Sequence, residues 1–149
     1  MEKVDKMLLG EYRHNLDNKG RVSIPSKFRN KFSEGIIITR GLDNCLFGFT
    51  KNEWLKVVEK INSLPLSQST ARAFSRLMLS GAFETEIDNQ GRILIPETLR
   101  NYANLDKKII IVGMYSRIEI WSEENWQKYK KDTEKNSDEI AERLSDLGI

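Results

Sequence analysis

The hydrophobic and polar positions of this chain change in short runs, which predict short strands and short helices. Apolar and polar residues alternate, with some irregularity, over 9–16 and 21–24, and this indicates two strands joined by a turn at 17–20. A β-branched run at 36–39 is typical of a buried strand, and a fourth strand is expected at 46–49.

Apolar residues with the spacing of a helix follow the second and the fourth of these strands. Ser26 is expected to cap a short helix in which Phe28 and Phe32, four residues apart, face inward. Thr50 and Glu53 have the spacing of a capping box, which opens a longer helix. The apolar face of that helix follows the i, i+3, i+4, i+7 pattern through Trp54, Val57, Val58 and Ile61.

The second half of the chain repeats this order of elements after a break at 63–65 and one more helix. That helix is expected from about Ser67 or Thr70 and carries Ala73, Phe74, Leu77 and Met78. Further strands are expected at 82–87, 92–95, 108–112 and 117–121, with a short helix at 97–103. Ser122 is expected to cap a helix that contains Trp126 and Tyr129.

The C-terminal tail has one apolar stripe on an otherwise charged sequence. A last short helix is expected from Ser137, and Gly148 is its stop. Ile140, Leu144 and Leu147 recur at i, i+4 and i+7. We expect this stripe to dock on the core or on a neighbouring molecule rather than to recognise a separate ligand.

The order of elements repeats because the sequence itself repeats. Asp17-Asn18-Lys19-Gly20-Arg21 returns 71 residues later as Asp88-Asn89-Gln90-Gly91-Arg92. A chain of this kind has built one structural unit twice. We therefore divide it into a first repeat at 7–54, inter-repeat helices at 55–77, a second repeat at 78–126 and a helical tail at 127–149.

Each repeated stretch is predicted to be a hairpin loop. Aspartate can accept hydrogen bonds from amides of its own turn, and glycine supplies a positive φ. The loop-structuring residues are therefore Asp17, Gly20, Asp88 and Gly91. Arg21 and Arg92 stand where the chain re-enters a strand. Three interpretations remain open for these arginines: exposure on a stable hairpin, a salt bridge to the loop aspartate, or both together.

Composition excludes several classes of function. His14 is the only histidine and Cys45 the only cysteine, so no disulfide can form within the chain and nothing supports a Cys–His catalytic pair. No zinc-binding spacing and no phosphate-binding glycine loop is present. We expect no enzyme activity, no cofactor, no metal and no small-molecule substrate. The lone cysteine and the short apolar runs favour a cytoplasmic protein without a membrane span.

The remaining chemistry is that of a basic loop. Formal net charge is only +2, but residues 1–35 carry eight Lys and Arg against five Asp and Glu. Arginine presents a planar fork of donors that matches phosphate or the edge of guanine. The basic candidates of the first copy are Arg13, Lys19, Arg21, Lys27 and Arg29. In the second copy only Arg92 and Arg100 persist, so we expect the first loop to contribute more to binding.

The motifs in this order resemble those of the MraZ family. Each Asp-x-x-x-Arg loop is followed by a (Val/Ile)-x-Ile-Pro-x-x-(Phe/Leu)-Arg segment and by a strand that ends in Thr-Lys-Asn-Glu-Trp or Ser-Glu-Glu-Asn-Trp. The resemblance covers about residues 7–147 and leaves residues 1–6 without a role. It implies an α+β fold of two tandem AbrB-like swapped-hairpin β-barrel units, with packed helices and a pseudo-twofold internal repeat.

The resemblance also implies a function. The expected protein is a sequence-specific DNA-binding transcriptional regulator of the division and cell-wall gene cluster. It would bind direct repeats in its own promoter as a homo-oligomeric ring, typically an octamer, in the cytoplasm and at the nucleoid. Arg21 and Arg92 would face double-stranded DNA. The alternative is a protein-binding, antitoxin-like module of the AbrB fold, although the tail after Trp126 is short and has helical patterning.

Overall fold

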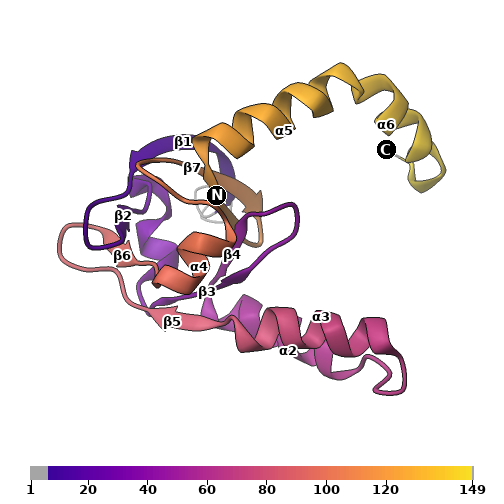
Figure 1. Ribbon diagram of the computed structural model, residues 1–149, viewed down its shortest axis with the longest axis horizontal. Coiled ribbons are helices and arrows are strands. Elements are labelled where there is room, and N and C mark those ends of the chain that lie inside the picture. The colour runs from indigo at the N-terminus through magenta and orange to yellow at the C-terminus, as the bar shows by residue number, and fades with distance from the viewer. Residues whose placement is uncertain (1–6, 149) are drawn as a thin grey trace.

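The α+β architecture is built on an antiparallel sheet with helices around it (Figure 1). The computed structural model of the chain describes residues 7–148. Within that range the sheet has six strands, in the order β1 (Leu8–Asn15), β7 (Lys108–Tyr115), β8 (Ile118–Ser122), β4 (Leu46–Phe49), β3 (Ile36–Arg40) and β5 (Phe83–Thr85). A separate ribbon pairs β2 (Arg21–Ser23) with β6 (Arg92–Leu94).

Four of the strand pairs join one repeat to the other, and one of them pairs β4 with β8 from Leu46↔Ile120 to Gly48↔Ile118. Strand β1 pairs with β7 from Leu8↔Tyr115 to Asn15↔Lys108, and β5 pairs with β3 from Ile36↔Thr85 to Ile38↔Phe83. The ribbon is the fourth such pair. These partners explain two differences from the expected bounds. Strand β7 runs on to Tyr115 because β1 pairs with its whole length, whereas β5 is shorter than 82–87 because β3 offers it three partners.

Short helices follow the ribbon strands in both repeats, namely η1 (Ser26–Phe32) and α4 (Glu97–Tyr102). The expectation that Ser26 caps the first of them was wrong. Pro25 occupies the N-cap position with an extended backbone, and no side chain caps the helix. Ser26 is already inside the first turn, so its hydroxyl is not placed before the free amides that a cap would bind.

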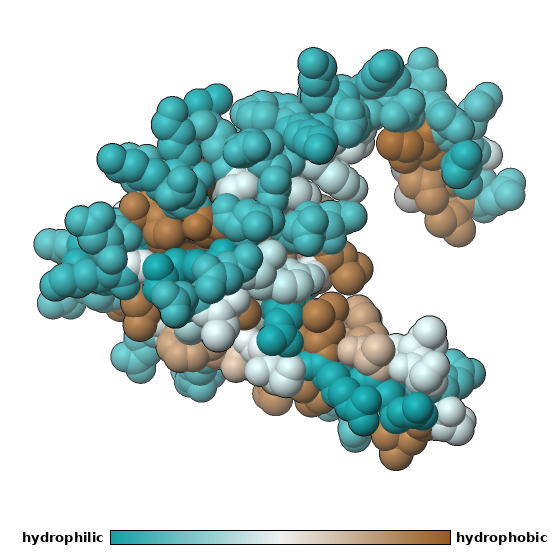
Figure 2. Space-filling view, viewed as in Figure 1, coloured by the Kyte–Doolittle hydropathy of each residue, from teal (hydrophilic) through white to brown (hydrophobic). Residues whose placement is uncertain are grey.

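Two longer helices, α2 (Lys51–Asn62) and α3 (Ser69–Ser80), form an arm that extends from the sheet (Figures 1 and 2). The amide of Glu53 donates to Thr50 Oγ1 over 3.2 Å, so the predicted cap is confirmed. Trp54 and Val57 pack with the buried Phe49 and Met78 at the base of the arm. This α2–α3 arm comprises residues 51–80.

The tail forms a second arm from α5 (Glu123–Lys135), α6 (Ser137–Arg143) and η2 (Ser145–Leu147). The predicted cap at Ser122 is confirmed, because the Asn125 amide donates to its Oγ over 3.1 Å. Of the two expected places for the tail stripe, the chain's own core is excluded, since Ile140 and Leu144 are about two fifths exposed and Leu147 is 71% exposed, and docking on a neighbouring molecule stays a prediction. The core does not cover the stripe because α5 carries it away from the sheet (Figure 1).

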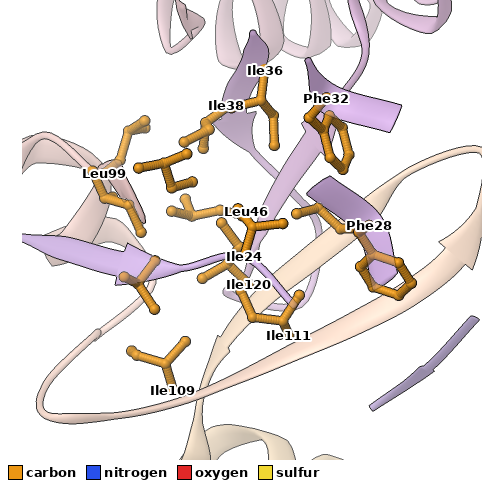
Figure 3. Close-up of a cluster of buried hydrophobic side chains, with 14 of the residues drawn as sticks. Ile24, Phe28, Phe32, Ile36, Ile38, Leu46, Leu99, Ile109, Ile111 and Ile120 are labelled. Atoms are coloured by element: carbon orange, nitrogen blue, oxygen red, sulfur yellow. The ribbon is translucent and has the colours of Figure 1, made fainter. Parts of the chain in front are cut away.

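The main core is shared by the two repeats (Figure 3). Phe28 and Phe32 are buried as expected, and Phe28 meets the ring of Tyr12 edge-on with centroids 5.2 Å apart. Equivalent positions lie in the same cluster, for example Ile24 with Ile95. Burial of one such side chain contributes about 1.5–3 kcal/mol. This common core holds the two repeats and the ribbon between them in one fixed arrangement.

Candidate nucleic-acid interface

The two Asp-x-x-x-Arg loops lie side by side because the strands that leave them pair with each other. In the ribbon Arg21 is opposite Leu94 and Ser23 is opposite Arg92. Two further hydrogen bonds of 2.8 Å cross between the repeats, from Ile24 N–H to the Gly91 carbonyl and from Ile95 N–H to the Gly20 carbonyl. The loops therefore form one composite surface, on the side of the molecule away from the two helical arms (Figure 1).

The first loop is ordered by one aspartate. Asp17 Oδ1 accepts hydrogen bonds from the backbone amides of Lys19 and Arg21, both over 2.9 Å. Its Oδ2 accepts from Arg21 Nε, also over 2.9 Å. The amide of Gly20 donates to the Asp17 carbonyl, and φ at Gly20 is +81°, which an L side chain rarely adopts.

The second loop repeats this geometry. Asp88 Oδ1 accepts from the amides of Gln90 and Arg92 over 2.9 Å, and Oδ2 accepts from Arg92 Nε over 3.1 Å. Gly91 has φ +79°. Both arginines are the first residue of a ribbon strand, so the expectation that they occupy equivalent positions is confirmed.

Each loop arginine forms a salt bridge and is also partly exposed to solvent. The side chains of Arg21 and Arg92 are 32% and 26% exposed, and each gives its Nε to the aspartate of its own loop. Arg92 Nη1 also lies 3.6 Å from Asp17 Oδ2, which links the two loops. A guanidinium has five N–H donors in a fixed fork. The aspartate therefore orients the fork and leaves further donors for a phosphate or a base edge.

The aspartates stay ionised because the fold stabilises their charge. Hydrogen bonds from the backbone amide of Arg21 lower the pKa of Asp17, and the Arg21 guanidinium adds to this effect. The amide of Arg92 lowers the pKa of Asp88 in the same way. The loops are thus preorganised at neutral pH, with an anionic centre that positions a cation.

Two further arginines join the repeats from behind the loops. Arg29 Nε donates to the Ile24 carbonyl and Arg100 Nε to the Ile95 carbonyl, both over 2.9 Å. A Cβ added at Gly91 would collide with the Arg29 guanidinium, and one at Gly20 would press on that of Arg100. Each arginine therefore packs on the loop of the other repeat. The sequence signal, an arginine after Ile-Pro-x-x-(Phe/Leu), marks both residues but not the loop that they contact.

The other basic candidates are spread over neighbouring elements. Lys19 is exposed within the first loop, and Lys27 is exposed in the first turn of η1. Arg13 lies on β1 and forms a 2.9 Å ion pair with Glu123 at the start of α5. The structure therefore groups Lys19, Arg21 and Arg29 with Arg92, whereas Arg13 is engaged with the tail helix.

The single cysteine and the single histidine are both at least partly buried in the fold. Burial raises the pKa of the Cys45 thiol, whose Sγ donates to the Leu42 carbonyl over 3.1 Å. Burial, together with the charge of Arg29, lowers the pKa of His14. Within residues 7–148 no three His, Cys, Asp or Glu side chains are grouped to hold a metal ion. No helix in the same range is long and apolar enough to cross a membrane.

Comparison with known proteins identifies close relatives. A family model described as "MraZ protein, putative antitoxin-like" matches residues 7–77 and again 78–147. A protein of Caldicellulosiruptor saccharolyticus is 54% identical over 143 residues, which cover 96% of this chain and 100% of the relative. Proteins of Natranaerobius thermophilus and Caldanaerobacter subterraneus are 51% and 50% identical with the same coverage. All three are named transcriptional regulator MraZ.

Proposed function

Because the chain belongs to the MraZ family, we propose that it regulates transcription by binding double-stranded DNA through its paired loops. The family that the motifs indicated is confirmed by the two matches to the family model and by the full-length relatives. Those relatives are named as regulators of transcription and not as enzymes. The chain is accordingly a regulator rather than a catalyst.

One observation supports the proposal that the paired loops form the DNA-binding surface. The ribbon brings Arg21 and Arg92 together from positions 71 residues apart, and an aspartate orients each guanidinium. Arginine can take a phosphate or the O6/N7 edge of guanine with two parallel hydrogen bonds. Lys19 adds a charge on the first loop. In this proposal Arg21, Arg92 and Lys19 contact DNA, Lys27 and Arg13 lie beside the contact, and Arg29 supports the loops.

The finer architecture is part of the proposal. We infer that the two repeats are AbrB-like swapped-hairpin units of a β-barrel, related by a pseudo-twofold. The pairing of β1 with β7, of β5 with β3 and of β2 with β6 supports this, since every one of these pairs takes one strand from each repeat. The division at 7–54, 55–77, 78–126 and 127–149 stays a prediction.

The binding free energy that a tight DNA site needs, together with the likeness to the MraZ family, leads to a proposal for the DNA target and for the assembly of copies. We propose that the protein binds direct repeats in its own promoter, upstream of division and cell-wall genes, as a ring of copies in the cytoplasm and at the nucleoid. A nanomolar site needs about −12 kcal/mol, whereas one bidentate contact to guanine contributes about 1–3 kcal/mol of discrimination. Two loops on a chain of net charge +2 supply too little, but several copies on one assembly supply enough.

The family description gives one reason to keep a second candidate, since it contains the words antitoxin-like. In that case the chain would bind a partner protein. AbrB-like antitoxins present a long disordered tail to the toxin, whereas residues 123–147 here are almost entirely helical. The observation favours DNA as the partner.

A gel-shift titration on the chain's own upstream DNA, at a stated salt concentration, tests the proposal. We expect Arg21→Ala to weaken binding more than Arg92→Ala, because Lys19 stands beside Arg21 where Gln90 stands beside Arg92. Lys128→Ala, an exposed lysine on α5, is the matched control and should bind like wild type. Unchanged binding by both loop variants would remove the proposed surface, and equal losses would contradict the predicted asymmetry.

A further inference from the structure

The first loop is held from behind by an arginine of the second repeat. The Arg100 guanidinium lies against Gly20, so close that a Cβ at this position would meet Nε and Cζ at 3.0 Å. Arg100 Nε donates to the Ile95 carbonyl over 2.9 Å, and the Ile95 amide donates to the Gly20 carbonyl over 2.8 Å. Arg100 therefore packs on the loop and also fixes the residue whose amide binds the loop.

The second loop is held in the same way by an arginine of the first repeat. An added Cβ at Gly91 would collide with the Arg29 guanidinium. Arg29 Nε donates to the Ile24 carbonyl over 2.9 Å, and the Ile24 amide donates to the Gly91 carbonyl over 2.8 Å. A hydrogen bond from an ionised donor is roughly twice as strong as one between neutral groups. The two supports are equivalent, and they cross between the repeats.

The guanidinium at the front of a loop depends on the backbone behind it. The amides of Lys19 and Arg21 both donate to Asp17 Oδ1, and the other oxygen of this carboxylate accepts from Arg21 Nε. A shift of the turn would therefore move the carboxylate and, with it, the guanidinium. Gly20 lies between the two amides, so the group that packs on Gly20 limits where the turn can lie. Groups that are held in place before a ligand arrives lose less entropy when it binds.

Chain order alone would assign these supports differently. Arg29 follows the first loop and Arg100 follows the second, each on the short helix of its own repeat. A role confined to one repeat would make Arg29 the support of Arg21 and Arg100 that of Arg92. The contacts reverse this assignment, because each helix places its arginine under the loop of the other repeat.

We propose that Arg100 is a positioning residue for Arg21 and that Arg29 is a positioning residue for Arg92, so that each repeat orients the DNA contact of the other. This inference rests on the proposed function, because the contact that is oriented is the proposed contact with DNA. It follows that neither repeat presents its arginine correctly unless the other repeat is folded against it.

Hydrogen exchange of the full chain, measured without DNA, tests the crossed support. Both loops have the same four hydrogen-bonded amides, those of Asp17, Lys19, Gly20 and Arg21 and those of Asp88, Gln90, Gly91 and Arg92. Methionine has a similar length to arginine and no donor. We expect Arg100→Met to speed exchange in the first loop by about tenfold or more, as for one lost hydrogen bond to a charged group, and to leave the second loop near wild type. Arg29→Met should do the reverse.

Two further variants control this measurement. Arg76→Met, at an exposed arginine of α3, should change neither loop. Arg100→Lys keeps the charge without the planar guanidinium, and it should show the pattern of Arg100→Met with a smaller amplitude. A general loss of stability speeds exchange in both loops, so it cannot imitate a crossed pattern. Faster exchange in the loop of the same repeat, or equal changes in both loops, would overturn the proposal.

A gel-shift titration connects the support to DNA binding. In Arg21→Ala the first loop has already lost its proposed contact, so the addition of Arg100→Met should weaken binding only slightly, whereas the addition of Arg29→Met should weaken it several-fold. Both double variants lose the same charge, so electrostatic attraction does not explain a difference between them. Equal further losses, or a larger one with Arg100→Met, would contradict the positioning role. A crossed exchange pattern in a protein that binds no DNA would refute the proposed function alone.

Discussion

At the scale of single residues, the loop aspartates have two tasks. Asp17 and Asp88 each accept two backbone amides with Oδ1, which orders the turn, and one guanidinium Nε with Oδ2, which orients the arginine. A salt bridge that steadies the loop is therefore compatible with an arginine that reaches a ligand. Removal of either aspartate should disturb the position of the arginine as well as the turn.

Acid should remove this order through Asp17 and Asp88. Their pKa is lower in the folded protein than in the unfolded chain, so the stabilisation is fully present above the unfolded value of about 3.9 and is lost as pH falls through the folded value. We expect Asp17→Asn/Asp88→Asn to melt below wild type at pH 7, with the difference closing below about pH 4. Melting curves at several pH values check this, and a difference that is independent of pH would contradict it.

Glycine substitution should separate backbone strain from crowding. Gly91→Ala combines a positive φ with a collision against Arg29, whereas Gly148→Ala has almost the same φ, +78°, and open space around the added methyl. Positive φ alone costs an L residue about 1–2 kcal/mol. We expect a clear fall in melting temperature for Gly91→Ala and a smaller one for Gly148→Ala. Equal losses would mean that Arg29 moves aside freely.

At the scale of elements, strand exchange makes each repeat incomplete by itself. Strand β1 finds its partner in β7, and β3 finds one of its partners in β5, so a single repeat would leave long edges and half of the core exposed. The ribbon is even more dependent, because each of its strands has three residues and one partner. The composite loop surface therefore exists only when both repeats are present.

Separate expression of the repeats tests this dependence. Residues 7–77 and residues 78–148 should each fail to unfold cooperatively as monomers, since each has lost the strands that cover its core. Mixing the two fragments should restore a cooperative transition. Circular dichroism with thermal melting provides the measurement. A single fragment that melts cooperatively as a monomer would show that the exchange is dispensable.

At the scale of the whole molecule, the loops and the arms lie on opposite sides (Figure 1). Copies that meet on the side away from the loops would leave every loop pair uncovered. Loops on successive copies could then meet successive turns of one duplex, about 34–36 Å apart. Once one copy has bound, its neighbours bind at high effective concentration, which is how weak individual contacts become a tight complex.

DNA with two correctly spaced repeats should bind far more tightly than DNA with one. We expect a gain of about 10²–10⁴-fold for wild type from effective concentration. Titration of both duplexes with the wild-type protein, at one salt concentration, measures this gain. A single repeat bound as tightly as two would remove the multivalent mechanism while DNA binding itself survived.

The sequence by itself determined the features that a few neighbouring residues can encode. The repeat, the turn at each Asp-x-x-x-Arg loop, the caps at Thr50 and Ser122, and the inward face of Phe28 and Phe32 all depend on local hydrogen bonds or on the period of a helix or strand. These features also predicted the order of the helices and strands, and the ends of the observed strands differ from the expected ends by a few residues. The expected hairpins were wrong, because the strands that flank each loop pair with strands of the other repeat and not with each other. The Ser26 cap failed because one position, occupied by Pro25, decides which residue stands outside the helix.

Only the tertiary structure decided which distant segments meet. The pairing of β2 with β6, the packing of Arg29 and Arg100 on the loop of the other repeat, and the exposure of the tail stripe have no local signal. Strand partners are chosen by the burial of the whole core, and a helix such as α5 is directed by its contacts at one end. Local chemistry could specify two loops with one arginine each, but the shared core alone makes them a single surface.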